Sequence, residues 1–224
     1  MTKNHKAQII SAPQRKGGVG KSTMICSLAG WLAKDGAKVC IIDTDPQKTC
    51  ERWMEKQEIG VSVLYLDNDE LLAPSVQKLS ADFDVIFIDT AGYKSAMAMY
   101  AIALSDLVLI PSKASEPDAE GAIRTWNHVK SIGITSAKKA RSYIVFTDVD
   151  KTAKITQVVK DAISAEGAEF LEKPLWSRTG FKEMHSHGGL PSGSALTALR
   201  EFIGSLQISG LIDFYNIERA TQNG

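Results

Sequence analysis

Six short apolar runs alternate along the chain with longer stretches of helical periodicity. The runs are rich in Val and Ile, are bounded by Gly, Pro or Asp, and cover residues 7–12, 38–42, 61–66, 84–88, 107–110 and 142–147. Continuous apolar runs of this length are typical of strands that are buried on both faces of a sheet. The sequence therefore predicts about six buried strands.

Apolar residues at helical spacing occupy four of the stretches between and after these runs. They lie at 25–32, 119–126, 155–163 and 196–206, and Gly36 is placed to end the first helix. Strand–helix alternation predicts right-handed βαβ units. The expected fold is one α/β domain over residues 1–224: a doubly wound, mainly parallel sheet with helices on both faces. Ligands of such sheets bind beyond the carboxyl ends of the strands.

The first strand-to-helix junction is rich in glycine and lysine. Gly17, Gly18 and Gly20 can direct successive backbone N–H groups at an anion, and the start of the following helix adds its unpaired donors. Lys21 would contact the β- and γ-phosphates of a nucleotide, and Ser22 would bind Mg²⁺. An ordinary glycine-rich turn is the alternative, but the strand before the loop and the helix after it favour phosphate binding.

The loop departs from the usual phosphate-loop pattern, which has glycine where this chain has Arg15, and it carries an additional lysine, Lys16. The stretch KGGVGKS resembles the deviant Walker A motif of the ParA/MinD family of ATPases. The resemblance implies that ATP and Mg²⁺ are the cofactors and that ATP is held between two subunits. It also implies a phosphate-binding set of Lys16, Gly17, Gly18, Val19, Gly20, Lys21, Ser22 and Thr23.

The resemblance gives Lys16 a specific role, because in that family the signature lysine reaches the phosphates bound by the partner subunit. A cation supplied by a second subunit links phosphate recognition to dimerisation, as an arginine finger does. A solvated lysine beside the loop is the alternative interpretation.

The second predicted strand ends in the acidic segment IIDTDPQ, which is similar to the family's second acidic motif. The resemblance makes Asp43 the catalytic residue that orients the attacking water, beside Lys16 and Lys21. Asp45 lies before a proline and is expected to cap a turn.

A further carboxylate, Asp89, ends the apolar run DVIFID. It fits a Walker B residue that holds Mg²⁺ together with Ser22 and so belongs to the nucleotide-binding set. Asp118 follows the fifth predicted strand, in a segment that resembles the family's loop near the nucleotide and the dimer interface. We expect it to cap a helix rather than to take part in catalysis.

Charge and cysteine content narrow the function classes. The chain has 26 Lys and Arg against 26 Asp and Glu, which excludes a uniformly basic nucleic-acid coat. Its 3 cysteines show no metal-binding spacing and all precede residue 51, so a disulfide framework, structural zinc and a cluster-carrying ATPase are excluded. No stretch suits a signal peptide or a spanning helix, and we expect a cytoplasmic protein.

Family members that position cargo bind DNA non-specifically as ATP dimers, through scattered basic residues. The candidates in this sequence are Lys138, Lys139, Arg141, Lys151, Lys154, Lys173, Arg178, Lys182 and Arg200. Four of these are the preferred DNA contacts: Arg178, Lys182, Lys151 and Lys154. Solvated helix faces are the alternative for each of them. Many relatives carry an adenine-contacting Asn after the sixth strand, where Thr147 and Asp148 stand here, so the adenine pocket stays unassigned.

The resemblance as a whole implies a partition ATPase of the ParA type. Such a protein would form a homodimer with ATP, bind non-specific DNA of the nucleoid, and hydrolyse ATP slowly until a centromere-binding, ParB-like adaptor and DNA stimulate it. No N-terminal helix-turn-helix extension is expected. The alternatives are a MinD-like ATPase that cycles on a membrane and a ParA-like ATPase that positions a protein cargo. The acidic residues Asp213 and Glu218 in the tail disfavour the membrane.

Overall fold

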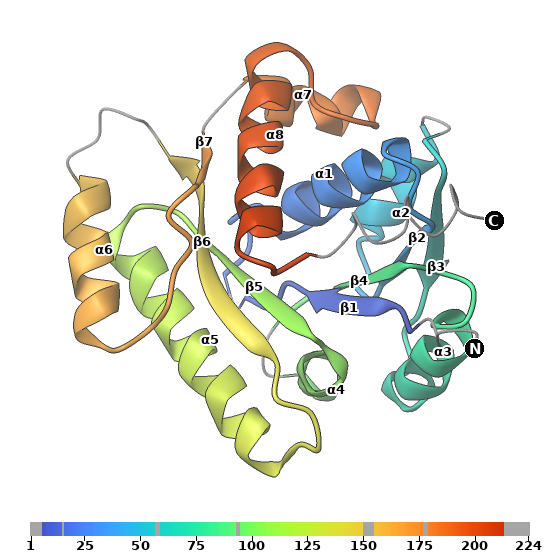
Figure 1. Ribbon diagram of the computed structural model, residues 1–224, viewed down its shortest axis with the longest axis horizontal. Helices are drawn as coiled ribbons and strands as arrows, with labels where there is room; N and C mark the ends of the chain where they lie inside the picture. The colour runs from blue at the N-terminus through green and yellow to red at the C-terminus, as the bar shows by residue number, and fades with distance from the viewer. Residues whose placement is uncertain are drawn as a thin grey trace.

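A seven-stranded parallel sheet organises the protein (Figure 1). The computed structural model describes residues 6–14, 16–56, 59–92, 95–149, 155–176 and 179–212. The strands are β1 (Gln8–Ser11), β2 (Val39–Asp43), β3 (Val61–Tyr65), β4 (Val85–Asp89), β5 (Leu107–Ser112), β6 (Arg141–Val149) and β7 (Leu175–Trp176). Their order is β3-β2-β4-β1-β5-β6-β7, and every pairing is parallel. The six predicted strands are confirmed, and the short β7 extends the sheet beyond them.

Helices cover both faces of the sheet, as predicted. They are α1 (Lys21–Lys34), α2 (Thr49–Met54), α3 (Leu72–Leu79), α4 (Ala96–Leu104), α5 (Glu116–Thr135), α6 (Ile155–Ala165), α7 (Thr179–His187) and α8 (Gly193–Ile208). A 3₁₀ turn, Asp69–Leu71, leads into α3. Figure 1 shows α1, α7 and α8 above the sheet and α3, α4 and α5 below it. None of the helices within the described ranges is both long and apolar enough to cross a bilayer.

The central strands are apolar on both sides because helices cover both faces. On β4, Phe87 packs into the cluster formed with α1 and α8, whereas Ile86 and Ile88 pack into the cluster formed with α3 and α4. All three side chains are fully buried. Burial of a side chain of this size stabilises the fold by about 1.5–3 kcal/mol. This packing holds the carboxyl ends of the central strands in fixed positions.

Three strands end at the same edge of the sheet, where β1 leads into the glycine-rich loop and β2 and β4 end in aspartates. Asp43 and Asp89 are direct neighbours in the parallel register of β2 and β4. The Thr44 backbone N–H and hydroxyl both donate to the Asp89 carbonyl oxygen, at 3.0 and 2.7 Å. Because β1 lies between β4 and β5, this edge is also where the strand order reverses, which is where open α/β sheets bind ligands.

Candidate nucleotide site

The loop between β1 and α1 has the backbone of an anion cradle. Gly18 and Gly20 have φ angles of 72° and 89°, which residues with a side chain rarely adopt. A Cβ at Gly17 or Gly18 would meet nothing within 4 Å, so open space lies over the loop. Helix α1 starts at Lys21 with no side-chain cap and no acidic residue in its first turn. Its N–H groups and the positive end of its dipole therefore remain available to a phosphate.

Thr147, near the end of β6, contacts this loop at two residues. Its hydroxyl donates to the Val19 carbonyl oxygen at 2.6 Å, and its side chain lies in van der Waals distance of where a Cβ of Gly20 would stand. The Thr147 hydroxyl is thus engaged with the loop, and the adenine pocket stays unassigned. The side chain of Asp148 lies outside the described part of the structure.

Ser22 and Asp89 form the part of the site that fits Mg²⁺. The Ser22 hydroxyl donates to Asp89 Oδ2 at 2.6 Å, and Asp89 is 1% exposed. Burial raises the pKa of Asp89 to about 6, against the opposing effects of hydrogen bonds from Ser22 and Cys50. The other oxygen, Oδ1, and the Thr90 hydroxyl are buried and have no hydrogen-bond partner among the described residues.

Buried oxygens without partners suit a hard cation, because an unpaired polar atom is otherwise expensive to bury. The described residues contain no group of three or more His, Cys, Asp or Glu side chains that could hold a metal ion by themselves. Mg²⁺ at phosphate sites does not need one, since it is bound by one or two protein oxygens together with substrate phosphates and water. The residues present therefore fit Mg²⁺ delivered with a nucleotide.

Asp43 is fully buried and is held by backbone donors at the start of α2. Its Oδ2 accepts the N–H groups of Cys50 and Glu51 at 2.9 and 3.2 Å, and its Oδ1 accepts that of Asp45 at 3.1 Å. Burial raises the pKa of Asp43, and these N–H groups oppose the rise. The Asp45 carboxylate accepts the N–H of Gln47 at 2.9 Å, so the predicted turn cap is confirmed. Oδ1 of Asp43 retains a lone pair for a water molecule.

Lys16 lies at the loop entrance and forms an ion pair with Asp118 of α5. The distance from Lys16 Nζ to Asp118 Oδ1 is 2.7 Å, with the lysine 53% and the aspartate 6% exposed. Burial acts to raise the pKa of Asp118, but hydrogen bonds from Lys16 and Ser115 outweigh it and hold the pKa below its usual value. The N-cap of α5 is Ser115 rather than Asp118, and the Ser115 hydroxyl donates to Asp118 Oδ2 at 2.6 Å.

Comparison with known proteins identifies the family. The family model described as VirC1 protein matches residues 7–198. The chain belongs to the VirC1 family. This VirC1-family protein is 26% identical over 185 residues to protein ParA of Rhizobium radiobacter. The alignment covers 81% of this chain and 83% of that protein. The VirC1-family protein is 25% identical over 190 residues to protein virC1 of the same organism, in an alignment that covers 82% of each chain.

Among solved structures, an ATP complex of a McdA variant from Cyanothece superposes with a TM-score of 0.75 at 20% identity, over 95% of this chain and 99% of that one. This similarity supports the fold. Together with the sequence relatives, it places the VirC1-family protein among the ParA/MinD-type P-loop ATPases, as the loop motif predicted.

The structure brings most of the predicted phosphate and metal residues of this VirC1-family protein to one edge of the sheet. Of the four basic residues preferred as DNA contacts, only Lys182 lies within the described part of the chain. Lys151, Lys154 and Arg178 lie outside the described residues, and Lys182 is exposed on α7. The contacts that sequence reasoning missed are those of Cys50, Asp118 and Thr147. Of these, only Asp118 carried a local signal, since its spacing from Ser115 is that of a capping box.

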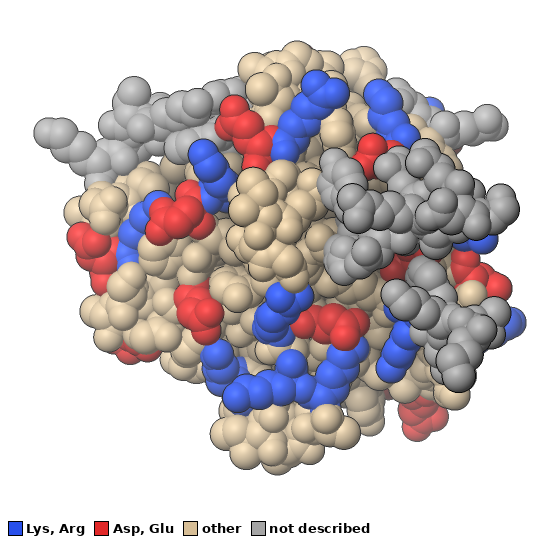
Figure 2. Space-filling model, in the orientation of Figure 1, with Lys and Arg blue, Asp and Glu red and all other residues tan. Residues whose placement is uncertain are grey.

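Several other basic residues that were candidates for DNA contact make contacts within the fold. Lys138 pairs with Asp106 at 2.6 Å, and Arg141 donates to the Gly210 carbonyl oxygen at 2.8 Å. The Arg200 guanidinium stacks over the Trp31 ring at 5.1 Å. Figure 2 shows Lys and Arg side chains in a short row low on the molecule, near where α5 leads into β6, whereas acidic and basic side chains mix over the rest of that face.

Proposed function

We propose that this protein is an ATPase that dimerises with ATP, binds DNA without sequence preference and positions or segregates a DNA cargo. The observation that carries the proposal is the meeting of the phosphate loop, Lys16, Asp43 and Asp89 at one sheet edge. A further relative, the chromosome-partitioning ATPase Soj of Thermus thermophilus, is 24% identical over 205 residues, and its name supports partition of DNA as the class of function.

Each of these residues has a separate task in the proposed hydrolysis of ATP. The backbone of residues 17–22 and Lys21 would bind the phosphates, and Ser22 and Asp89 would hold the Mg²⁺, which neutralises charge on them. Asp43 would orient the water that attacks the γ-phosphate. Phosphoryl transfer to water demands little covalent chemistry from a protein, so positioning and charge stabilisation account for most of the catalysis.

The Lys16–Asp118 ion pair supplies a reason for dimerisation to depend on ATP. In the single subunit the Lys16 ammonium is neutralised by Asp118. In the dimer, we propose, Lys16 leaves Asp118 for the phosphates held by the partner. The γ-phosphate of ATP adds negative charge that ADP lacks, so only ATP competes effectively with the carboxylate.

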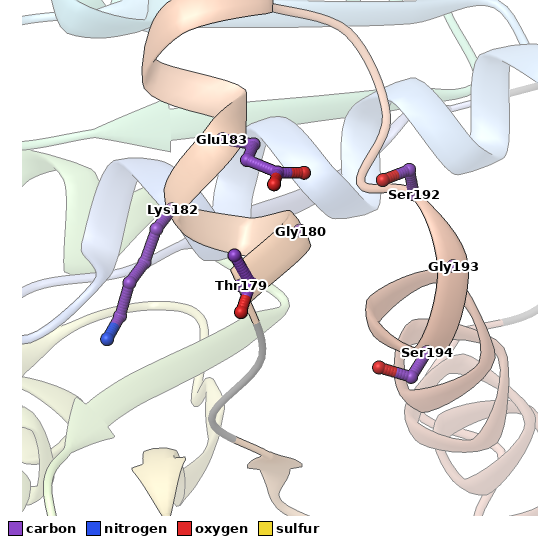
Figure 3. Close-up of a pocket in the computed structure, with 7 residues that line it drawn as sticks. All are labelled: Thr179, Gly180, Lys182, Glu183, Ser192, Gly193 and Ser194. Carbon is purple, nitrogen blue, oxygen red and sulfur yellow. The ribbon is translucent and has the colours of Figure 1, made fainter.

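DNA contact is proposed for Lys182, together with Lys151, Lys154 and Arg178. Lys182 lines a pocket of about 380 Å³ between the first turns of α7 and α8. Figure 3 shows its side chain extending away from α7, while Thr179 and Ser194 lie on opposite sides of the pocket. Dimerisation doubles any such patch, and DNA affinity rises steeply with the number of phosphates contacted. A ParB-like adaptor bound to the cargo would then stimulate hydrolysis and release the dimer from the nucleoid.

A protein cargo is the second candidate. Maintenance of carboxysome distribution protein A of Synechococcus elongatus, which is 24% identical over 200 residues, favours it, because that relative is named for the distribution of carboxysomes. The two candidates share the ATP dimer and differ in what the adaptor is attached to.

The experiment that tests the proposal is binding to random-sequence duplex DNA with ATP, with ADP and without nucleotide, over a series of salt concentrations. We expect binding with ATP alone, weakening steeply as salt rises. The Lys16→Ala variant is the control, since it should bind nucleotide without binding DNA. An absence of DNA binding in every nucleotide state would contradict the proposal.

A further inference from the structure

Cys50, in the first turn of α2, contacts both acidic residues of the site. Its backbone N–H donates to Asp43 Oδ2 at 2.9 Å, and its thiol donates to Asp89 Oδ2 at 3.2 Å. The side chain is completely buried. One residue therefore links the carboxylate at the end of β2 to the carboxylate at the end of β4.

The thiol bond fixes which oxygen of Asp89 faces the site. Asp89 Oδ2 accepts two donors, the Ser22 hydroxyl and the Cys50 thiol, whereas Oδ1 is buried without a partner in the described part of the chain. Two donors on one oxygen restrain rotation of the carboxylate and leave Oδ1 available to a cation and its water shell. If the Ser22 oxygen turns to bind a metal ion, the thiol still holds Oδ2.

Burial favours the thiol of Cys50 as a hydrogen-bond donor to Asp89. The side chain is completely buried, so no solvent molecule competes for its proton. The neighbouring Cys26 of α1 offers only a neutral sulfur, and the Asp89 carboxylate is the stronger acceptor for the single S–H proton.

We propose that Cys50 is a positioning residue that fixes the geometry between the water-orienting Asp43 and the Mg²⁺-holding Asp89. The inference rests on the proposed nucleotide-dependent function, because it assigns Cys50 a task at that same Mg²⁺ site. The residue would act through Asp89, because its thiol bonds that carboxylate and its side chain has no exposed surface. Partners of this kind, one shell away from a metal ion, commonly change metal affinity by about 10–100-fold when removed.

The test compares two substitutions that differ in the donor. Cys50→Val keeps the approximate volume and loses the donor, whereas Cys50→Ser keeps a donor. Cys40→Val is the matched control, because Cys40 is also buried but makes its weak contact, at 3.8 Å, to the Ile41 carbonyl oxygen. The measurement is binding of fluorescent ADP, first in EDTA and then over a Mg²⁺ titration.

We expect Cys50→Val to need about tenfold more Mg²⁺ for half-maximal tightening of ADP binding, with unchanged binding in EDTA. Cys50→Ser and Cys40→Val should behave as the unaltered protein. A normal Mg²⁺ dependence in Cys50→Val would overturn the inference, and so would an equal loss in Cys50→Ser, which would point to packing. If Cys50→Val fails to fold in a thermal melt, Cys50→Ala takes its place under the same criteria.

The outcome for the unaltered protein separates this inference from the proposed function. If the unaltered protein shows no Mg²⁺-dependent ADP binding, the proposed function fails and the inference falls with it. If it shows such binding and Cys50→Val matches it, the function stands and only the role of Cys50 is rejected.

Discussion

Acidic side chains are buried at the sheet edge of the site. On helix α7, by contrast, charged side chains are exposed. Asp43 and Asp89 are 0% and 1% exposed, and Asp89 keeps an oxygen without a partner among the described residues. On α7, Lys182 is exposed, as its neighbour Glu183 is. A buried charge destabilises the fold unless something compensates it, so its presence indicates a ligand. An exposed charge has no such penalty, and its presence alone indicates no function.

The largest expected effect concerns the positive charge at the buried edge. Lys21→Ala should weaken nucleotide binding about 100-fold, because a charge-assisted hydrogen bond to phosphate is worth about 1.5–3 kcal/mol. Titration of fluorescent ADP would measure it. Lys34→Ala, at the exposed far end of the same helix, is the control and should bind normally.

Asp43→Ala should leave nucleotide binding intact and slow hydrolysis at least about 100-fold, since it removes the group that we propose orients the attacking water. An ATP dimer should then accumulate, visible by size-exclusion chromatography with light scattering. Asp43→Asn keeps an acceptor for the N–H groups at the start of α2, so it separates chemistry from folding of that segment. Prompt hydrolysis by either variant would remove Asp43 from its assigned role.

The buried carboxylate of Asp89 should make the nucleotide-free protein less stable at neutral pH. Its pKa is about 6 in the folded protein against 3.8 as the reference, so the folded state binds the proton more tightly. This group's contribution to the free energy of unfolding falls as pH rises from about 4 to about 6, by about 3 kcal/mol. Asp89→Asn removes the penalty and should therefore melt higher than the unaltered protein at pH 7.

The measurement for Asp89→Asn is a pair of thermal melts in EDTA, at pH 7 and at a pH of about 4. The advantage of the variant should largely disappear at the lower pH, because the penalty develops only as pH rises above the pKa of the unfolded chain. An advantage that is the same at both pH values would mean that the charge is not its source.

A smaller effect is expected when Asp118, the ion-pair partner of Lys16, is replaced, because the pair is half exposed. Lys16→Ala should bind nucleotide but stay monomeric. Asp118→Asn frees the lysine and should tighten ATP-dependent dimerisation by roughly fivefold, within the range of a partly exposed ion pair. Sedimentation at several protein concentrations would measure both. Weaker dimerisation of Asp118→Asn would contradict a competition between Asp118 and phosphate.

The smallest effect is expected among the exposed charges. Lys182→Ala should weaken DNA binding by about two- to threefold and reduce the salt dependence by about one phosphate contact per subunit. Lys78→Ala, an exposed lysine on α3, is the matched control. If both variants bind DNA equally well, Lys182 is a solvated side chain and nothing more.

The same contrast accounts for what could be predicted from the sequence. The buried strands were predictable because a short apolar run between turn residues is the pattern that a strand covered on both faces requires. Asp43 and Asp89 were predictable because they end such runs. Contacts between distant segments leave no local pattern: Cys50 and Asp89 are 39 positions apart, and Thr147 and Val19 are 128. Strand β7 was missed because two residues are too few to show a period.

The pairing of Lys16 with Asp118 also bears on how the protein would respond to its own abundance. A contact within one chain has a fixed effective concentration, whereas a contact between two chains strengthens as more protein is made. If Lys16 exchanges between Asp118 and the phosphates of a partner subunit as proposed, the competition from Asp118 stays constant while that from the partner subunit rises with protein concentration. Below a certain copy number the lysine would remain with its own chain, and above it pairing would take over. A single ion pair at the entrance of the loop would in this way set the protein concentration above which the dimer forms.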